Sequence, residues 1–389
     1  MFRYDVTKQK ASKGKRALPA EHMDAGTARK ERKTNMIITG DMSAILHDTT
    51  MHTPVYLDVT TTPFSLHGFS EPFRRVPAPV AEKTSECVMR LSKVTAGGRV
   101  RFRTTSDFVV IHGELIGAEI SANSAPNASQ SFDIYVKEDG KHRFRGVFTP
   151  SQGAGKSYVE SRLKFHNNDM KDIIVYFPLN ASFSAVYVGL REGAVLEAGS
   201  AYTHEKPVVF YGSSIVHGGG SKPSAPYSAV ISRRLDTEFI NLGFGGGARA
   251  EEAIIDYIAT LDMSVFVYDY DHNAPDYDFL EKTHYEGYKR FRRQRPDVPV
   301  IMASRPDYFT RNFTLEYYTM ADVEKRRALI ESNYKRALAE GDRNVYFVDG
   351  SKIFPETLCD DCTSDGCHPN DLGYHFMANA FGAVIEKLL

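Results

Sequence analysis

The pattern of apolar residues changes near residue 206, and this change decides which kinds of sheet the chain can form. Over 55–199, short apolar or alternating runs follow one another without a convincing helix, which predicts an antiparallel sandwich. From 206 onward, five strand-like runs alternate with five helical stretches. Such alternation predicts a parallel sheet with helices on both faces. The 389 residues are enough for two domains, which we place at 36–205 and 206–389.

The strands and helices expected in each region follow from these patterns. In the first region the predicted strands cover 100–103, 108–111, 132–136, 143–148, 173–177 and 184–188. In the second region they cover 207–211, 239–242, 265–270, 298–303 and 345–349. The predicted helices cover 227–235, 251–258, 279–293, 322–340 and 371–389. Asp139-Gly140 separates two alternating runs and predicts a hairpin, because Gly readily takes the positive φ of such turns.

Charge is distributed unevenly along the chain. The whole sequence has 48 Lys and Arg against 49 Asp and Glu, a net charge of −1 that argues against a nucleic-acid-binding protein. Residues 1–35 nevertheless hold ten basic residues against four acidic ones, and we expect them to form a disordered extension. No apolar run follows that would make a signal peptide, so we expect a cytoplasmic protein. No run approaches the roughly 18 apolar residues of a membrane span.

Residues suited to acyl transfer follow the predicted strands. The first strand of the second region ends in Gly212-Ser213-Ser214, the second leads into the Gly-rich stretch 243–247, and the third is followed by Asn273. In an open parallel sheet, ligands bind outside the carboxyl ends of the strands. The loop before the last helix holds Asp365 and His368, at a spacing that lets the carboxylate orient the ring. A Ser nucleophile, a His base, an Asp, and Gly or Asn donors are the groups that acyl transfer needs.

The order of these residues resembles that of the SGNH hydrolases, also called GDSL-type esterases, over 206–389. The resemblance implies a three-layer α/β/α sandwich with a five-stranded parallel sheet. It implies that Ser214 is the nucleophile and that Asp365 and His368 complete the triad. It further implies that the backbone N–H groups of Ser214 and Gly246 and the side-chain amide of Asn273 stabilise the oxyanion.

Two strings of residues also resemble a bacterial subgroup of this superfamily. They are Tyr211-Gly212-Ser213-Ser214-Ile215-Val216-His217-Gly218 and Asp271-His272-Asn273-Ala274-Pro275. The subgroup has a jelly-roll-like antiparallel β-sandwich ahead of the hydrolase domain, as in certain carbohydrate esterases and acyltransferases. The resemblance of 36–205 is to this architecture only, because that region holds no specific motif.

The function implied is that of a serine esterase that needs no cofactor and no metal. Its expected partner is a small acylated molecule, and the resemblance favours removal of a short acyl group, often acetyl, from a carbohydrate or similar hydroxyl compound. An acyltransferase with the same triad and a non-catalytic carbohydrate-binding protein are the alternatives. We expect no nucleic acid and no membrane as partners, and the oligomeric state stays open.

One departure from the family pattern leaves a second candidate nucleophile. The usual Gly-Asp-Ser is Gly-Ser-Ser here, so Ser213 stands where the family has Asp. That Asp is not a member of the triad, and the family spacing favours Ser214 over Ser213 as the nucleophile.

A cluster of cysteines near His368 allows a different interpretation. Cys359, Cys362 and Cys367 lie within ten residues of the chain together with His368, and three thiols and an imidazole can bind zinc. A zinc ion on His368 would prevent that ring from acting as the base. The other possibilities are a Cys359–Cys362 disulfide and unpaired thiols, and we favour unpaired thiols because reduced Cys is the rule inside cells.

Three further residues are candidates for contact with substrate. His217 follows Ser214 by three residues, His272 precedes Asn273, and Arg305 follows the fourth strand of the parallel sheet. Each has a structural alternative. His217 and His272 could stabilise the local turns, and Arg305 could form an ion pair with a neighbouring loop.

Overall fold

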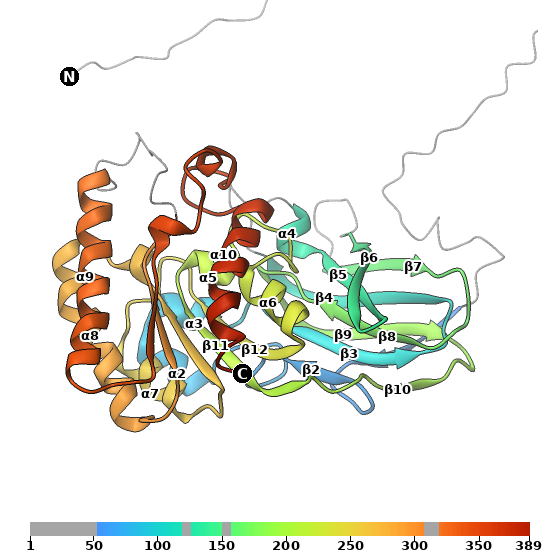
Figure 1. Cartoon of the computed structure of the whole chain (residues 1–389). Helices are drawn as coiled ribbons and strands as arrows, with labels where there is room; N and C mark the ends of the chain where they lie inside the picture. The colour runs from blue at the N-terminus through green and yellow to red at the C-terminus, as the bar shows by residue number, and fades with distance from the viewer. Residues whose placement is uncertain (1–52, 119–125, 150–156, 307–318) are drawn as a thin grey trace, which may run out of the picture. The chain divides into compact units, whose positions relative to one another are not determined.

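The computed structural model describes residues 53–118, 126–149, 157–306 and 319–389. The predicted basic extension, 1–35, lies outside these residues. The described chain contains two antiparallel sheets, one parallel sheet and the helices that pack with them (Figure 1). All described residues belong to one compact unit, so a domain boundary near residue 205 stays a prediction.

Two antiparallel sheets enclose the core of the first half of the chain. The four-stranded sheet has the order β1 (Pro54–Asp58), β9 (Ala181–Arg191), β4 (Phe108–Ala118) and β7 (Tyr158–Lys164). The other has the order β10 (Leu196–Ala198), β3 (Arg99–Thr104), β8 (Lys171–Tyr176), β5 (Phe132–Glu138) and β6 (Lys141–Phe148), with β2 (Ser65–His67) also paired to β3. Alternate residues such as Val109 and Ile111 of β4 and Val100 and Phe102 of β3 meet in this core. The predicted antiparallel sandwich is therefore confirmed.

The predicted hairpin joins β5 and β6. Glu138 pairs with Lys141 at its end, and Asp139 and Gly140 both have positive φ, at 49° and 73°. A turn with two residues in this conformation twists in the same sense as the strands that it joins.

The parallel sheet has five strands. Their order is β12 (Thr237–Gly243), β11 (His204–Gly212), β13 (Val265–Asp269), β14 (Val300–Ala303) and β15 (Val345–Val348). The chain therefore passes from β11 to β12 at one edge of the sheet, and then crosses back to add β13, β14 and β15 on the other side of β11. This reversal makes a crevice at the carboxyl ends of β11 and β13, where α/β proteins of this topology bind ligands.

Helices cover both faces of the parallel sheet (Figure 1). Val208 and Phe210 of β11 face a core shared with α6 (Tyr227–Leu235) and α10 (Asp371–Ile385). Val209 and Tyr211 face the opposite core, shared with α7 (Glu252–Thr260), α8 (Tyr277–Gln294) and α9 (Met320–Ala339). The predicted three-layer α/β/α arrangement is confirmed. None of the helices in the described part of the chain is long and apolar enough to cross a bilayer.

The expectation of no helix in 55–199 is wrong. This region contains α2 (Ala78–Thr84), α3 (Glu86–Leu91) and the short α4 (Pro126–Gln130). Each has seven residues or fewer, and Ser85 ends α2 and caps α3 through a hydrogen bond from Val88 N. Because the periodic run is interrupted there, it is too short to give a helical signal. Ala81 and Val88 pack into the same core as α7 and α8, so these helices belong to a helical layer of the parallel sheet.

Candidate active site

The two serines at the end of β11 have different environments. Gly212 must be glycine, because a Cβ there would lie 1.8 Å from the backbone oxygen of Asp269. Ser213 is fully buried, and its Oγ accepts a hydrogen bond from Ile215 N at 3.2 Å, which caps the short helix α5 (Ser214–His217). Ser214 is the first residue of that helix and is partly exposed. Ser213 is therefore occupied as a helix cap, and Ser214 presents the accessible hydroxyl.

A continuous chain of hydrogen bonds joins Ser214, His368 and Asp365. Ser214 Oγ lies 2.8 Å from His368 Nε2, and His368 Nδ1 lies 2.7 Å from Asp365 Oδ2. The other carboxylate oxygen, Oδ1, accepts from the backbone N–H of His368 at 2.7 Å and of Cys367 at 3.1 Å. The three-residue spacing thus lets one carboxylate hold both the ring and the backbone of the loop. This arrangement suits a nucleophile, its base and the group that orients the base.

A run of glycines, which the sequence analysis did not single out, lets the His368 loop approach Ser214. A Cβ on Gly219 would lie 3.0 Å from His368 Cδ2 and 3.2 Å from Ser214 O. A Cβ on Gly220, whose φ is 86°, would lie 2.9 Å from Pro369 O. Three consecutive glycines at 218–220 are a visible signal, but only the structure shows what they approach.

Gly246 and Asn273 lie side by side at the same edge of the sheet. Gly246 N donates to Asn273 Oδ1 at 3.2 Å, and Asn273 Nδ2 donates to Phe244 O at 2.8 Å. These two partners fix the orientation of the amide, since one is a donor and the other an acceptor. Among the described residues the second proton of Nδ2 has no further acceptor. Gly246 N–H becomes available only when it releases Asn273, so the predicted role of Gly246 requires a local adjustment.

Buried groups hold the turn that carries Asn273. The turn is the 3₁₀ helix η1 (Asp271–Asn273), and Arg326 of α9 donates through Nη1 to Asp271 O at 3.3 Å and Ala274 O at 3.1 Å. Arg305 is 2% exposed, and its backbone N–H donates to Asp271 Oδ2 at 3.2 Å. The sequence analysis named Asp271 only as part of a family string, without a role, and it missed Arg326. Arg326 lies in an ordinary helical run about fifty residues away and gives no sequence signal.

The three candidate substrate-contact residues are all buried. His217 is 4% exposed, and its Nδ1 lies 3.2 Å from Gly243 O while its Nε2 lies 2.9 Å from Leu179 O. Burial, with a further contribution from Arg75, lowers the pKa of His217 to about 3. Its ring nitrogens face backbone carbonyls in the interior, which favours the structural alternative, and its contact with substrate stays a prediction. His272, at 8% exposed, and Arg305 lie beside Asn273 and Asp271, and their contact with substrate stays a prediction.

The cysteines near His368 do not surround it as zinc ligands would. Cys359 and Cys362 are buried thiols with no disulfide between them, and Cys359 Sγ donates to Glu356 O at 3.2 Å. Burial raises the pKa of Cys362 to about 11. Across the described residues, no three His, Cys, Asp or Glu side chains are grouped as metal ligands. The ring nitrogens of His368 face Ser214 and Asp365 instead.

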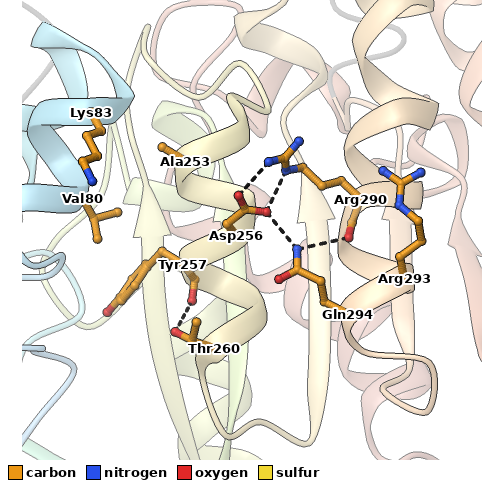
Figure 2. A pocket seen from close by; sticks show the side chains of 9 residues that line it. All are labelled: Val80, Lys83, Ala253, Asp256, Tyr257, Thr260, Arg290, Arg293 and Gln294. Carbon is orange, nitrogen blue, oxygen red and sulfur yellow. Dashed lines mark hydrogen bonds and ion pairs between the residues drawn. The ribbon is translucent and has the colours of Figure 1, made fainter.

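A large cavity lies away from this site. It has a volume of about 820 Å³ and is lined by residues of α2, α7 and α8, among them Lys83, Tyr257 and Arg293 (Figure 2). Arg290 and Gln294 reach across it to Asp256. None of the predicted site residues lines this cavity.

Family models match both halves of the chain. The model of the GDSL-like lipase/acylhydrolase family matches residues 205–386, and the model of the N-terminus of SGNH hydrolase-type esterases matches residues 28–196. The chain belongs to the SGNH (GDSL-like) hydrolases. The family is one of lipases and acylhydrolases, which hydrolyse acyl esters, and this SGNH hydrolase is accordingly an ester hydrolase. No functionally curated protein matches it.

Solved structures share the fold of this SGNH hydrolase over most of its length. One described as a GDSL-like lipase from Bacteroides ovatus is 25% identical, with a TM-score of 0.78 over 86% of this chain and 98% of that one. A salicylyl-acyltransferase from a tetracycline biosynthetic pathway is 18% identical, with a TM-score of 0.66 over 86% and 98%. A family two carbohydrate esterase from Cellvibrio japonicus is 10% identical, with a TM-score of 0.52 over 87% and 98%.

Proposed function

We propose that this SGNH hydrolase is a serine esterase that removes a short acyl group, acetyl foremost, from a carbohydrate or similar small hydroxyl compound. The observation that carries the proposal is the hydrogen-bonded chain of Ser214, His368 and Asp365 at the carboxyl edge of the parallel sheet. Gly246 and Asn273, at the same edge, supply hydrogen-bond donors. The carbohydrate part of the proposal is supported by the shared fold with carbohydrate esterases.

The reaction proceeds in two steps through an acyl-enzyme. His368 Nε2 takes the proton of Ser214 Oγ as the oxygen attacks the ester carbonyl, and Asp365 stabilises the imidazolium that forms. The amide of Asn273 and the backbone N–H of Ser214 stabilise the oxyanion, and Gly246 N–H joins them once it releases Asn273 Oδ1; each donor contributes about 3 kcal/mol. His368 then protonates the leaving alkoxide, and it activates the water that releases the acyl group.

Transfer to an alcohol instead of water is the second candidate function. It uses the same residues up to the acyl-enzyme and differs only in the group that attacks it. The observation that favours it is the shared fold with a salicylyl-acyltransferase at a TM-score of 0.66. Adding a carbohydrate alcohol to the assay separates the two functions, because a transferase forms a new ester in place of the free acid.

The test is hydrolysis of acetylated sugars and short-chain chromogenic esters by the full chain and two serine variants. Ser214→Ala should lower kcat by about 10⁶-fold while the protein stays folded, since it removes the nucleophile. Ser213→Ala is the matched control. It should keep turnover and lose about 1 kcal/mol of stability with the helix cap. Full activity of Ser214→Ala would contradict the proposal, and loss of activity in Ser213→Ala alone would transfer the nucleophile to that residue.

A further inference from the structure

A buried arginine from the first half of the chain binds the end of β12. Arg75, which precedes α2, is 1% exposed. Its Nη1 donates to Gly243 O at 2.8 Å and to Asn241 O at 3.2 Å. Its Nη2 donates to Leu91 O at 2.6 Å, and its Nε donates to Val94 O at 3.1 Å. Arg75 therefore joins the end of α3 to the end of the strand that leads into the Gly-rich loop.

The charge of Arg75 is held by carbonyl groups and not by a carboxylate. Among the described residues it forms no ion pair, and its guanidinium lies 4.9 Å from the centre of the Phe244 ring. Burial lowers the pKa of Arg75 to about 9, so the group is still protonated at neutral pH. A buried charge is costly unless hydrogen bonds satisfy it. Four carbonyl oxygens do so here, and two of them belong to β12.

Phe244, which follows these carbonyls directly, connects three parts of the candidate site. Its backbone N–H donates to Gly212 O at 2.8 Å, just before the two serines. Its carbonyl accepts from Asn273 Nδ2 at 2.8 Å and from Gly247 N at 2.9 Å. A shift of Phe244 would therefore move the Gly-rich loop relative to both Ser214 and Asn273.

Helix α3 also contacts the Gly-rich loop directly. Cys87 Sγ lies 3.5 Å from Gly245 O, and a Cβ on Gly247 would lie 2.7 Å from the same sulfur. The loop thus packs on α3 while Arg75 binds the end of α3 and the end of β12. A segment that precedes the hydrolase half in the sequence therefore packs against the loop that carries Gly246.

We propose that Arg75 is a positioning residue for catalysis, which fixes the loop 244–248 and with it the Gly246 N–H and the partner of Asn273. The proposal rests on the function proposed above, because it gives the loop an oxyanion-stabilising role. It assigns part of the active centre to the first half of the chain. That half is then required for turnover itself, and not only for stability or for binding substrate.

Arg99 provides a matched control. It is also fully buried and also joins the first half of the chain to β12, but it does so at the opposite end of that strand. Its Nη2 pairs with Glu238 and donates to Phe239 O at 3.1 Å. Replacing either arginine by lysine keeps the charge and removes the planar fork that reaches several acceptors. Only the substitution of Arg75 should alter the position of active-site groups.

The experiment compares the full-length variants Arg75→Lys, Arg75→Met and Arg99→Lys with the wild type. Because Arg75 has no carboxylate partner among the described residues, Arg75→Met leaves no unpaired charge, and we expect it to fold. Hydrogen exchange of the peptide covering 244–248 should be at least about tenfold faster in both Arg75 variants and unchanged in Arg99→Lys. The value of kcat on a short-chain ester should fall about 100-fold with little change in KM, as for a misplaced catalytic group.

The outcomes separate the two proposals. Exchange is measured without substrate, so it tests the positioning role even if every ester proves inert and the proposed function fails. Unchanged exchange of the loop in Arg75→Met would overturn the inference. If exchange became faster throughout the protein, and to the same degree in Arg99→Lys, Arg75 would have only a general stabilising role. That result would also overturn the inference. Faster exchange with an unaltered kcat would overturn its catalytic consequence.

Discussion

The two ends of strand β12 bind buried arginines in opposite ways. At the amino end, Arg99 pairs with Glu238, which His67 also contacts. At the carboxyl end, Arg75 binds only backbone carbonyls among the described residues. Both arginines come from the first half of the chain. At the amino end of β12 the buried arginine is therefore neutralised by a carboxylate. At the carboxyl end the buried arginine is stabilised by backbone carbonyl groups alone.

This difference separates stability from function within one strand. A compensated pair contributes to stability as long as both partners are present, and its removal leaves a buried charge. Carbonyl groups held by an arginine instead fix the path of the backbone, here at the edge where ligands bind in parallel sheets. We expect changes at the carboxyl end to lower turnover and changes at the amino end to lower stability.

The largest expected effect belongs to the carboxyl edge. Asp365→Asn should lower kcat by about 10⁴-fold, because the amide no longer favours the ring tautomer that accepts the proton of Ser214. Asp365 has 31% of its side chain exposed, so the midpoint of thermal unfolding should change little. Steady-state kinetics and thermal melts check both expectations. The exposed neighbour Asp360→Asn is the control, and an equal loss of kcat in that variant would contradict the role of Asp365.

The second effect belongs to the amino end of β12. Glu238→Gln should lower the free energy of unfolding by about 3–5 kcal/mol, because it leaves Arg99 as an unpaired buried charge. The kcat of the protein that stays folded should not change. Urea unfolding and kinetics below the melting temperature measure the two quantities. A large loss of kcat without loss of stability would break the proposed contrast between the two ends.

The pH dependence of stability gives a second readout of Glu238. Burial raises the pKa of this carboxyl, but the charge of Arg99 and the contact with His67 outweigh burial and hold it below its usual value of 4.5. A lowered folded-state pKa means that the ionised group stabilises the fold above pH 4.5 and loses this effect as the pH falls through the lower value. Glu238→Gln should lack this part of the acid-induced loss of stability.

The smallest of the three effects concerns the oxyanion donor. Asn273→Ala should lower kcat by about 10²–10³-fold with a small change in KM. Asn273→Asp keeps the oxygen that accepts from Gly246 N and removes Nδ2, which donates to Phe244 O and is the proposed oxyanion donor. Equal losses of kcat in both variants would show that Nδ2 matters. Retained activity in Asn273→Asp would assign Asn273 to loop support alone.

The predicted strands and helices of the α/β half agree closely with the structure, whereas several elements of the first half have no signal in the sequence. Strands and helices of ordinary length leave a periodic pattern, as at 227–235, where prediction and α6 coincide. Helices α2 and α3 do not, because seven and six residues are too few to show a period. Pairs such as Ser214 and His368 were predicted because both follow the family order and both lie at the ends of elements.

Sequence alone determined the alternation of strands and helices in the second half, the class of sheet in each half and the residues suited to acyl transfer, because each depends on local pattern or spacing. Only the tertiary structure decided what surrounds them. It shows that Ser213 is a buried cap, that His217 faces carbonyl groups, and that Arg75 binds β12 from 166 residues away. Such contacts depend on burial and on distance in space, and a position along the chain encodes neither.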